Sequence, residues 1–184
     1  MPKFRTIAVT SVIAAAGLLA GCSSSSSTAS STTTSAPVTS TPSVAIGTIP
    51  AADLSPAGTQ GKLPAVVVPT SPPPTTLQVA TLIPGSGPKV KDGDSVTVQY
   101  TLATYSAGKV IQSSYTDGSG PFVVQHVGAG EVIPGWDAGL VGMQAGERKE
   151  FIIPASLGYG ANSPGAGIAA NDTLVFIVDL IKIN

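Results

Sequence analysis

Hydrophobic and polar residues alternate with a period of two in several segments of the second half of the chain, which predicts β-strands. In residues 95–104, the side chains of Val96, Val98, Tyr100 and Leu102 fall on one face. The same kind of pattern predicts further strands at residues 76–83, 109–113, 122–127, 148–154 and 173–183. The folded part is therefore expected to consist mostly of strands.

The last predicted strand, residues 173–183, differs from the others because both of its faces are apolar. Leu174, Phe176, Val178 and Leu180 face one way, and Val175, Ile177 and Ile181 face the other. A strand that is apolar on both faces is typical of a position covered on both sides. We expect this strand to lie in the centre of the sheet.

One short helix is predicted after the run EVIPGW, residues 131–136, which contains the only tryptophan of the chain. Pro134 suits the first turn of a helix, where a missing N–H costs nothing. Trp136, Leu140 and Met143 then share one helix face. Trp136 is either an ordinary core residue or the flat surface of a binding pocket. An antiparallel sheet with one helix against it is an α+β fold.

The first 21 residues have the pattern of a secretory signal. Lys3 and Arg5 precede an uncharged stretch that is shorter than the roughly 20 residues of a comfortable membrane span. Small residues before the single cysteine, Cys22, resemble a bacterial lipobox, which implies cleavage before Cys22 and its lipidation. An extracytoplasmic protein anchored to a bacterial membrane is expected. The alternative is an ordinary signal peptide with a stray cysteine, which could form no intramolecular disulfide.

Residues 22–74 have the composition of a disordered tether. Twelve of the thirteen residues 23–35 are serine or threonine, and residues 36–74 contain nine prolines. Only Asp53 and Lys62 carry charge, and no aromatic residue is present, so little apolar surface is available for burial. Val66, Val67 and Val68 could alternatively pair as an edge strand. The expected domains are a signal peptide at 1–21, a tether at 22–74 and a folded domain at 75–184.

The residue types required for acid–base, nucleophilic or metal chemistry are nearly absent. The only histidine, His126, falls in a predicted strand and is expected to be a surface residue rather than a base. No cysteine or histidine accompanies a serine as a triad requires, and no metal-ligand spacing occurs, so no cofactor or metal is expected. After the signal, seven Lys and Arg face ten Asp and Glu, which argues against nucleic-acid binding.

Five segments in order resemble the FKBP-type peptidyl-prolyl cis–trans isomerases. They are residues 98–101 (VQYT), 108–114 (GKVIQSS), 131–136 (EVIPGW), 157–160 (LGYG) and 173–176 (TLVF). The resemblance implies a twisted antiparallel sheet wrapped around one short helix. It also implies an apolar aromatic pocket that binds a twisted Xaa-Pro amide without covalent or metal chemistry.

By matching position, the resemblance assigns catalytic roles to Tyr159, Ile133, Tyr100 and Phe176. It assigns substrate binding to Trp136, Val132, Phe122, Ile168, Ile111 and Gln112. The Ile133 N–H and the Tyr159 hydroxyl would hold substrate carbonyls, and Trp136 would form the floor beneath the proline ring. For each of these residues, plain core packing is the alternative.

The sequence departs from the family pattern at the rim of this pocket. Gln112 stands where an aspartate is usual, and Ile111 stands where an aromatic is usual. The loop 161–171 carries small residues in place of bulkier ones. Two functions therefore stay open: an isomerase that assists the folding of exported proteins, or a weakly active, membrane-tethered chaperone or binding module for proline-containing peptides.

The expected partners are proline-containing polypeptides, the membrane through lipidated Cys22, and macrolide inhibitors. The protein is expected to be a monomer.

Overall fold

The computed structural model describes residues 44–184. The predicted signal peptide, Cys22 and the tether up to residue 43 lie outside the described residues. Among the helices of residues 44–184, none has the length and apolar character that a membrane crossing demands.

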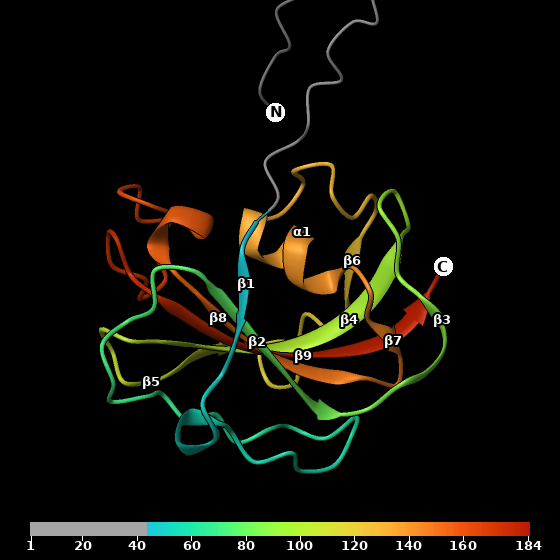
Figure 1. Ribbon diagram of the computed structural model, residues 1–184, viewed down its shortest axis with the longest axis horizontal. Coiled ribbons are helices and arrows are strands. Elements are labelled where there is room, and N and C mark those ends of the chain that lie inside the picture. Colours follow the sequence, from blue (N-terminus) through green and yellow to red (C-terminus); the bar gives the residue numbers. More distant parts are fainter. Residues whose placement is uncertain (1–43) are drawn as a thin grey trace, which may run out of the picture. The chain divides into compact units, whose positions relative to one another are not determined.

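The main element is a seven-stranded sheet (Figure 1). Its strands are β1 (Ile46–Thr48), β2 (Leu77–Ile83), β4 (Val96–Thr104), β5 (Lys109–Ser113), β6 (Phe122–Val124), β8 (Arg148–Ile153) and β9 (Leu174–Ile183). The order is β1-β2-β8-β9-β4-β5, with β6 also paired to β4. Two-residue β7 (Gln144–Ala145) pairs with β3 (Ser86–Lys89) in a second small sheet, and η1 (Ala51–Asp53) and η2 (Ala155–Leu157) are 3-10 turns.

The predicted α+β architecture is confirmed, with one correction to the strand directions. Every pairing of the main sheet is antiparallel except that of β1 with β2, which is parallel. A parallel neighbour requires a long connection, and residues 49–76 supply it. The sheet is therefore mixed, because a strand that lay in the predicted tether extends its edge.

The strands predicted at 76–83, 95–104, 109–113, 148–154 and 173–183 correspond to β2, β4, β5, β8 and β9. The strand predicted at 122–127 ends at Val124 instead. The backbone N–H groups of Gln125 and His126 donate to the Glu131 carboxylate, so the chain turns there rather than continuing a ladder. His126 consequently lies in a turn and not in a strand, as an exposed residue.

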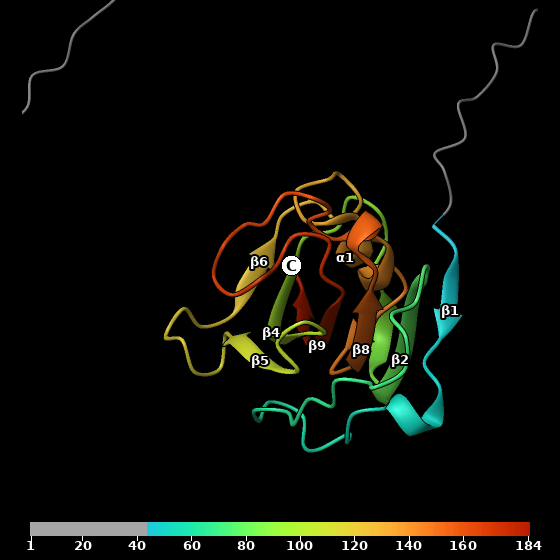
Figure 2. The ribbon, with the colours of Figure 1, turned by 90° about the vertical axis from the view of Figure 1, so that its left-hand side faces the viewer.

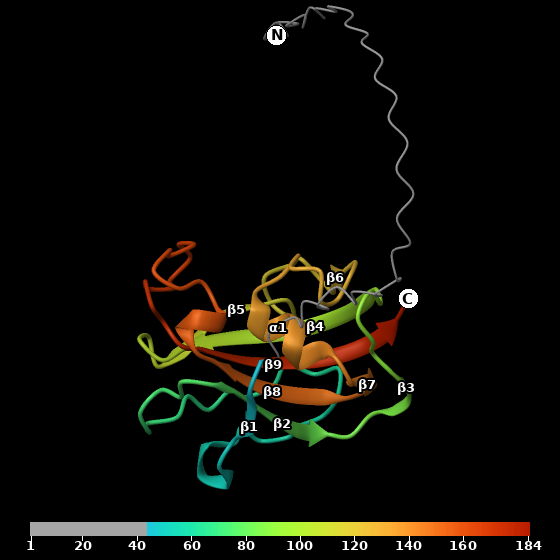
Figure 3. The ribbon, with the colours of Figure 1, turned by 45° about the horizontal axis from the view of Figure 1, so that its top comes forward.

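Helix α1 (Pro134–Leu140) packs on one face of the sheet (Figure 3). Trp136 and Leu140 are buried on one face of α1 as predicted, whereas Met143, expected on the same helix face, lies beyond the end of the helix and is buried there. Two glycines on the sheet side allow the close approach. A methyl group at Gly139 would lie 2.9 Å from Phe151 Cζ, and one at Gly135 would overlap the Ile153 side chain.

The opposite face of the sheet is covered by residues 49–68, which corrects the prediction of a tether over residues 44–74 (Figure 2). Ile49 is buried with Ala103 of β4, Ile152 of β8 and Val175 of β9 in a second apolar cluster. Leu54, Val66 and Val68 pack against this cluster, although residues 66–68 form no strand. We call residues 44–74 the strap. The predicted central, doubly covered position of β9 is confirmed, and the strap provides the second cover.

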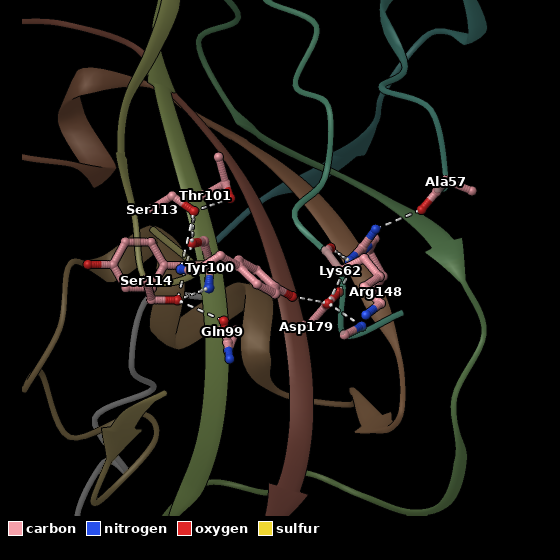
Figure 4. Close-up of polar contacts among 11 residues, drawn as sticks. Ala57, Lys62, Gln99, Tyr100, Thr101, Ser113, Ser114, Arg148 and Asp179 are labelled. Carbon is pink, nitrogen blue, oxygen red and sulfur yellow. Dashed lines mark hydrogen bonds and ion pairs between the residues drawn. The ribbon is translucent and has the colours of Figure 1, made fainter. Parts of the chain in front are cut away.

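Buried charges fix the strap to the sheet (Figure 4). Arg148 is fully buried and pairs with Asp179 at 2.5 Å (Nε–Oδ1) and 2.6 Å (Nη2–Oδ2). Two further N–H groups donate to the backbone carbonyls of Ala57 at 2.9 Å and Lys62 at 2.8 Å. Because a buried guanidinium is costly without hydrogen-bond partners, these strap carbonyls stabilise Arg148 in its buried position.

Candidate functional site

A pocket of about 490 Å³ opens between the N-terminal end of α1 and the sheet. Trp136, only 4% exposed, is surrounded by three other aromatic rings. The ring centroids of Phe176, Tyr100 and Phe122 lie 5.2, 5.5 and 6.1 Å from it, all at interplanar angles near 80°. Edge-to-face packing of this kind holds each ring in a defined orientation. The result is a rigid aromatic cup.

The sheet sets the positions of the aromatic walls. Tyr100 and Leu102 are two residues apart on β4, so both side chains point to the α1 side, and Leu102 is the register partner of Phe176 on β9. Ser114 closes the turn after β5 by accepting the Tyr100 N–H at its hydroxyl (2.9 Å) and donating its own N–H to the Tyr100 carbonyl (3.0 Å) (Figure 4). These bonds fix the backbone that carries Tyr100.

The polar groups that line the cup are few. Within residues 44–184, no acceptor pairs with the Ile133 N–H, the Tyr159 hydroxyl or the Tyr100 hydroxyl. Burial, followed by the charges of Asp117 and Tyr159, raises the pKa of Tyr100, so its hydroxyl remains a donor at neutral pH. These three groups can therefore donate hydrogen bonds to carbonyl oxygens of a bound peptide.

The described residues that line the pocket include few groups that could transfer a proton. No group of three His, Cys, Asp or Glu side chains in residues 44–184 is placed to hold a metal ion. The only carboxylate in the lining is Glu131, which accepts a 2.6 Å bond from His126 Nδ1 at the rim. That bond is the main cause that lowers the pKa of Glu131, with the N–H groups of His126 and Gln125 adding to it. The arrangement suits binding and orientation of a peptide rather than proton transfer.

Eight of the ten site residues assigned by resemblance line this one pocket. They are Tyr100, Gln112, Phe122, Val132, Ile133, Trp136, Tyr159 and Phe176. The lining also includes Leu102, Gly130 and Glu131, which the sequence argument did not assign. Leu102 could have been found from its alternation with Tyr100, and Glu131 from its place in the EVIPGW run. Gly130 has no comparable signal.

Ile111 and Ile168 are not part of the lining, contrary to expectation. Ile168 is 7% exposed and packs in the main core, with its N–H bonded to the Gly165 carbonyl. Ile111 is partly buried against the same core, and a methyl group at Gly167 would lie 3.7 Å from its Cγ2 atom. Ile168 thus anchors the 161–171 loop in the core, and the small Gly167 lets the loop lie close to Ile111.

A protein-family model described as FKBP-type peptidyl-prolyl cis-trans isomerase matches residues 87–181. A protein named FK506-binding protein from Streptomyces anulatus is 40% identical over 121 residues, which cover 65% of this chain and 96% of that protein. The Saccharomyces cerevisiae peptidyl-prolyl cis-trans isomerase FPR2 is 41% identical over 95 residues, 52% of this chain and 69% of that protein.

Two solved structures resemble the fold. FkpA from Escherichia coli superposes with a TM-score of 0.52 at 36% identity, over 60% of this chain and 49% of FkpA. AtFKBP13 gives a TM-score of 0.52 at 30% identity, over 60% of this chain and 95% of its own. The family model begins at residue 87, so the strap lies outside the matched region.

Proposed function

The chain belongs to the family of FKBP-type peptidyl-prolyl cis–trans isomerases, and we propose that the aromatic cup catalyses rotation about Xaa-Pro bonds. The main support for the proposal is that the pocket combines an indole floor with hydrogen-bond donors that have no acceptor among the described residues. Trp136 lies among Tyr100, Phe122 and Phe176, while the Ile133 N–H and the Tyr159 hydroxyl have no partner within residues 44–184.

Such a cup suits the reaction because no covalent bond has to be broken. The barrier to rotation, about 18–20 kcal/mol, comes from amide conjugation. In the twisted transition state the conjugation is lost and the amide is less polar, so an apolar, water-poor pocket binds it better than the planar ground state. Trp136 and Phe176 supply the apolar surface for the proline ring. The Ile133 N–H and the Tyr159 hydroxyl orient the neighbouring carbonyls, which keeps the peptide in place while one bond turns.

We further propose that the clients are exported proteins. The signal-like residues 1–21 and the lipobox-like sequence at Cys22 support an extracytoplasmic enzyme anchored to a bacterial membrane by a lipid. Proline isomerisation takes tens of seconds without a catalyst and limits the folding of such clients. Macrolides of the FK506 type are proposed as inhibitors, because relatives are named for binding FK506.

The test is an exchange measurement by NMR on a peptide with one Xaa-Pro bond, with a catalytic amount of the full chain. Faster exchange between the cis and trans signals supports the isomerase. Binding of the peptide without faster exchange contradicts it and supports a membrane-tethered binding module instead. The substitution of Gln112 for the usual aspartate is the feature that favours this second function. A lipid-labelling experiment in a bacterial host, with Cys22→Ala as its control, tests the anchor.

A further inference from the structure

A second groove, of about 900 Å³, lies on the outer side of α1. Its floor is the outward face of the helix, one wall is β1, and the other wall is the loop before the helix. The principal residues of these three surfaces are Pro134, Ala138, Val141, Val44, Ile46 and Ala129. The groove exists because the strap brings β1 to the edge of the sheet next to α1 (Figure 1).

Apolar side chains are exposed on both sides of this groove. Ile46 on β1 is 51% exposed, and Val141 at the end of α1 is 39% exposed. Exposed apolar residues that gather in one groove mark a binding surface more often than isolated ones do. β1 is also the last strand of its sheet, so one of its edges has no strand partner among the described residues.

The groove and the aromatic cup are neighbours, because Gly130 contributes to the lining of both. An extended polypeptide advances about 3.3 Å per residue. A client whose proline sits over Trp136 can therefore reach the groove with neighbouring residues of the same chain.

The charge in the groove favours a cationic partner. Its lining contains two carboxylates and no lysine or arginine. Asp137 is occupied, because its oxygens accept the N–H groups of Gly128 and Gly130, both at 2.9 Å. Asp92 is exposed and makes no side-chain hydrogen bond or ion pair within residues 44–184. It is therefore available to a lysine or arginine of a bound segment.

We propose that this groove binds the apolar, lysine- or arginine-containing segment that flanks the proline of the same client polypeptide. The inference rests on the proposed isomerase function and deepens it, because it assigns a second contact to the same substrate. The groove would lower KM for long, unfolded substrates and would leave short peptides unaffected. The aromatic cup would retain the chemistry.

The test compares two substrates of the full chain. One is a blocked tetrapeptide with a central Leu-Pro bond. The other carries the same bond and about eight additional valine, leucine and lysine residues, which span ~27 Å when extended. These residues precede the proline in one version of the peptide and follow it in a second version. The variant Ile46→Ser/Val141→Ser removes the apolar walls. Ile181→Ser is the matched control, because Ile181 is 42% exposed on β9 and outside both pockets.

We expect the extended peptide whose added residues reach the groove to have a KM about fivefold below that of the tetrapeptide. The Ile46→Ser/Val141→Ser variant should abolish this difference in KM. Tetrapeptide kinetics and the Ile181→Ser control should not change. Asp92→Asn should raise KM for the extended peptide with the lower KM and should leave KM for the tetrapeptide, which has no lysine, unchanged. If the extended peptide still has the lower KM in the double variant, the proposal is overturned. It is also overturned if KM for the extended peptide falls in that variant, because the groove would then hold the chain's own N-terminal segment or a second copy.

Failure of the proposed function has a different signature. If the wild-type chain accelerates neither substrate, the isomerase assignment fails, while the groove is still tested by an NMR titration with the extended peptide. Shifts of the Ile46 and Val141 amides in that titration, absent with the tetrapeptide, support the groove. Unchanged amides at both positions overturn it.

Discussion

Ser55 donates both its backbone N–H, at 2.9 Å, and its hydroxyl, at 2.6 Å, to the carboxylate of Glu150. Glu150 lies on β8 and is fully buried, and Ser55 supplies all of its side-chain hydrogen bonds within residues 44–184. A buried carboxylate is tolerated only when its oxygens are satisfied. The strap is therefore a structural part of the domain, which begins near residue 44 rather than at residue 75.

Ser55→Ala should destabilise the protein by about 1–3 kcal/mol, because it leaves one Glu150 oxygen buried without a partner. Urea unfolding monitored by Trp136 fluorescence measures the free energy. Ser71→Ala is the matched control, since its hydroxyl bonds to Asp53 at an exposed site on the same strap. Equal stabilities of the two variants would show that the Ser55 bond contributes nothing specific.

Glu150 should also make stability depend on pH in an unusual direction. Burial raises the pKa of Glu150 above its ordinary value, and the bonds from Ser55 only partly offset this. Between the ordinary pKa of Glu150 in the unfolded state and its raised pKa in the folded state, the folded protein holds a proton that the unfolded chain has released. The contribution of Glu150 to the free energy of unfolding therefore increases as the pH falls through this window and is lost as the pH rises.

Replacement by a neutral isostere removes this contribution. The stability of Glu150→Gln relative to wild type should decrease as the pH is lowered from about 7 towards about 4.5, where an ordinary glutamate titrates. Thermal or urea unfolding of both proteins across this range gives the difference directly. A difference that stays constant with pH would contradict the raised pKa.

Removal of the strap should unfold the domain or make it aggregate. A fragment of residues 75–184 would leave Glu150 without Ser55, and Arg148 without the carbonyls of Ala57 and Lys62. Breaking a buried charged site in this way typically costs about 3–5 kcal/mol, a large part of the total stability. A chain that begins at residue 44 should remain folded. Circular dichroism and size-exclusion chromatography compare the two, and equal stability would refute a structural role for the strap.

Gln112→Asp should raise turnover. The side chain lines the cup and already offers an amide oxygen as acceptor, so a carboxylate there would add the local negative charge that the family usually has at this position. A gain of about 1 kcal/mol in transition-state stabilisation corresponds to a roughly fivefold increase in kcat/KM. Gln112→Asn, which shortens the side chain without adding charge, is the control. If Gln112→Asp turns over the peptide no faster than the wild type, the missing negative charge at position 112 does not limit the activity.

Most of the site could be predicted because five ordered segments of the sequence resemble a known family, whose matching positions assigned eight of the residues that line the pocket. The residue patterns alone predicted the strand that carries Tyr100 and the helix start at Pro134, and they left open whether Trp136 belongs to the core or to a pocket. Ile168 was also assigned from the family position, and it packs in the main core instead of the lining because the conformation of the loop 161–171 determines its burial.

The strap could not be predicted for a different physical reason. Its composition, with many prolines and no aromatic residue, is that of a disordered segment. Its order comes instead from long-range contacts to charges on the sheet, such as Ser55 with Glu150, 95 positions away. The apolar outer face of β9 was the one signal that a cover existed, and Val175 does pack against the strap. The apolar pattern of β9 indicated that a segment covers its outer face, but it did not identify that segment as the strap.

The central claim is that isomerisation takes place over Trp136. The most direct measurement is the rate of cis–trans exchange of a Leu-Pro peptide with the full chain, its Trp136→Leu variant and its Trp136→Phe variant, each checked for folding by circular dichroism. We predict clear acceleration by the wild type and a loss of about tenfold or more with leucine, which removes the flat ring. Phenylalanine should retain part of the activity, because the indole N–H has no partner in residues 44–184. Full activity of a folded Trp136→Leu variant, or no acceleration by the wild type, would contradict the account.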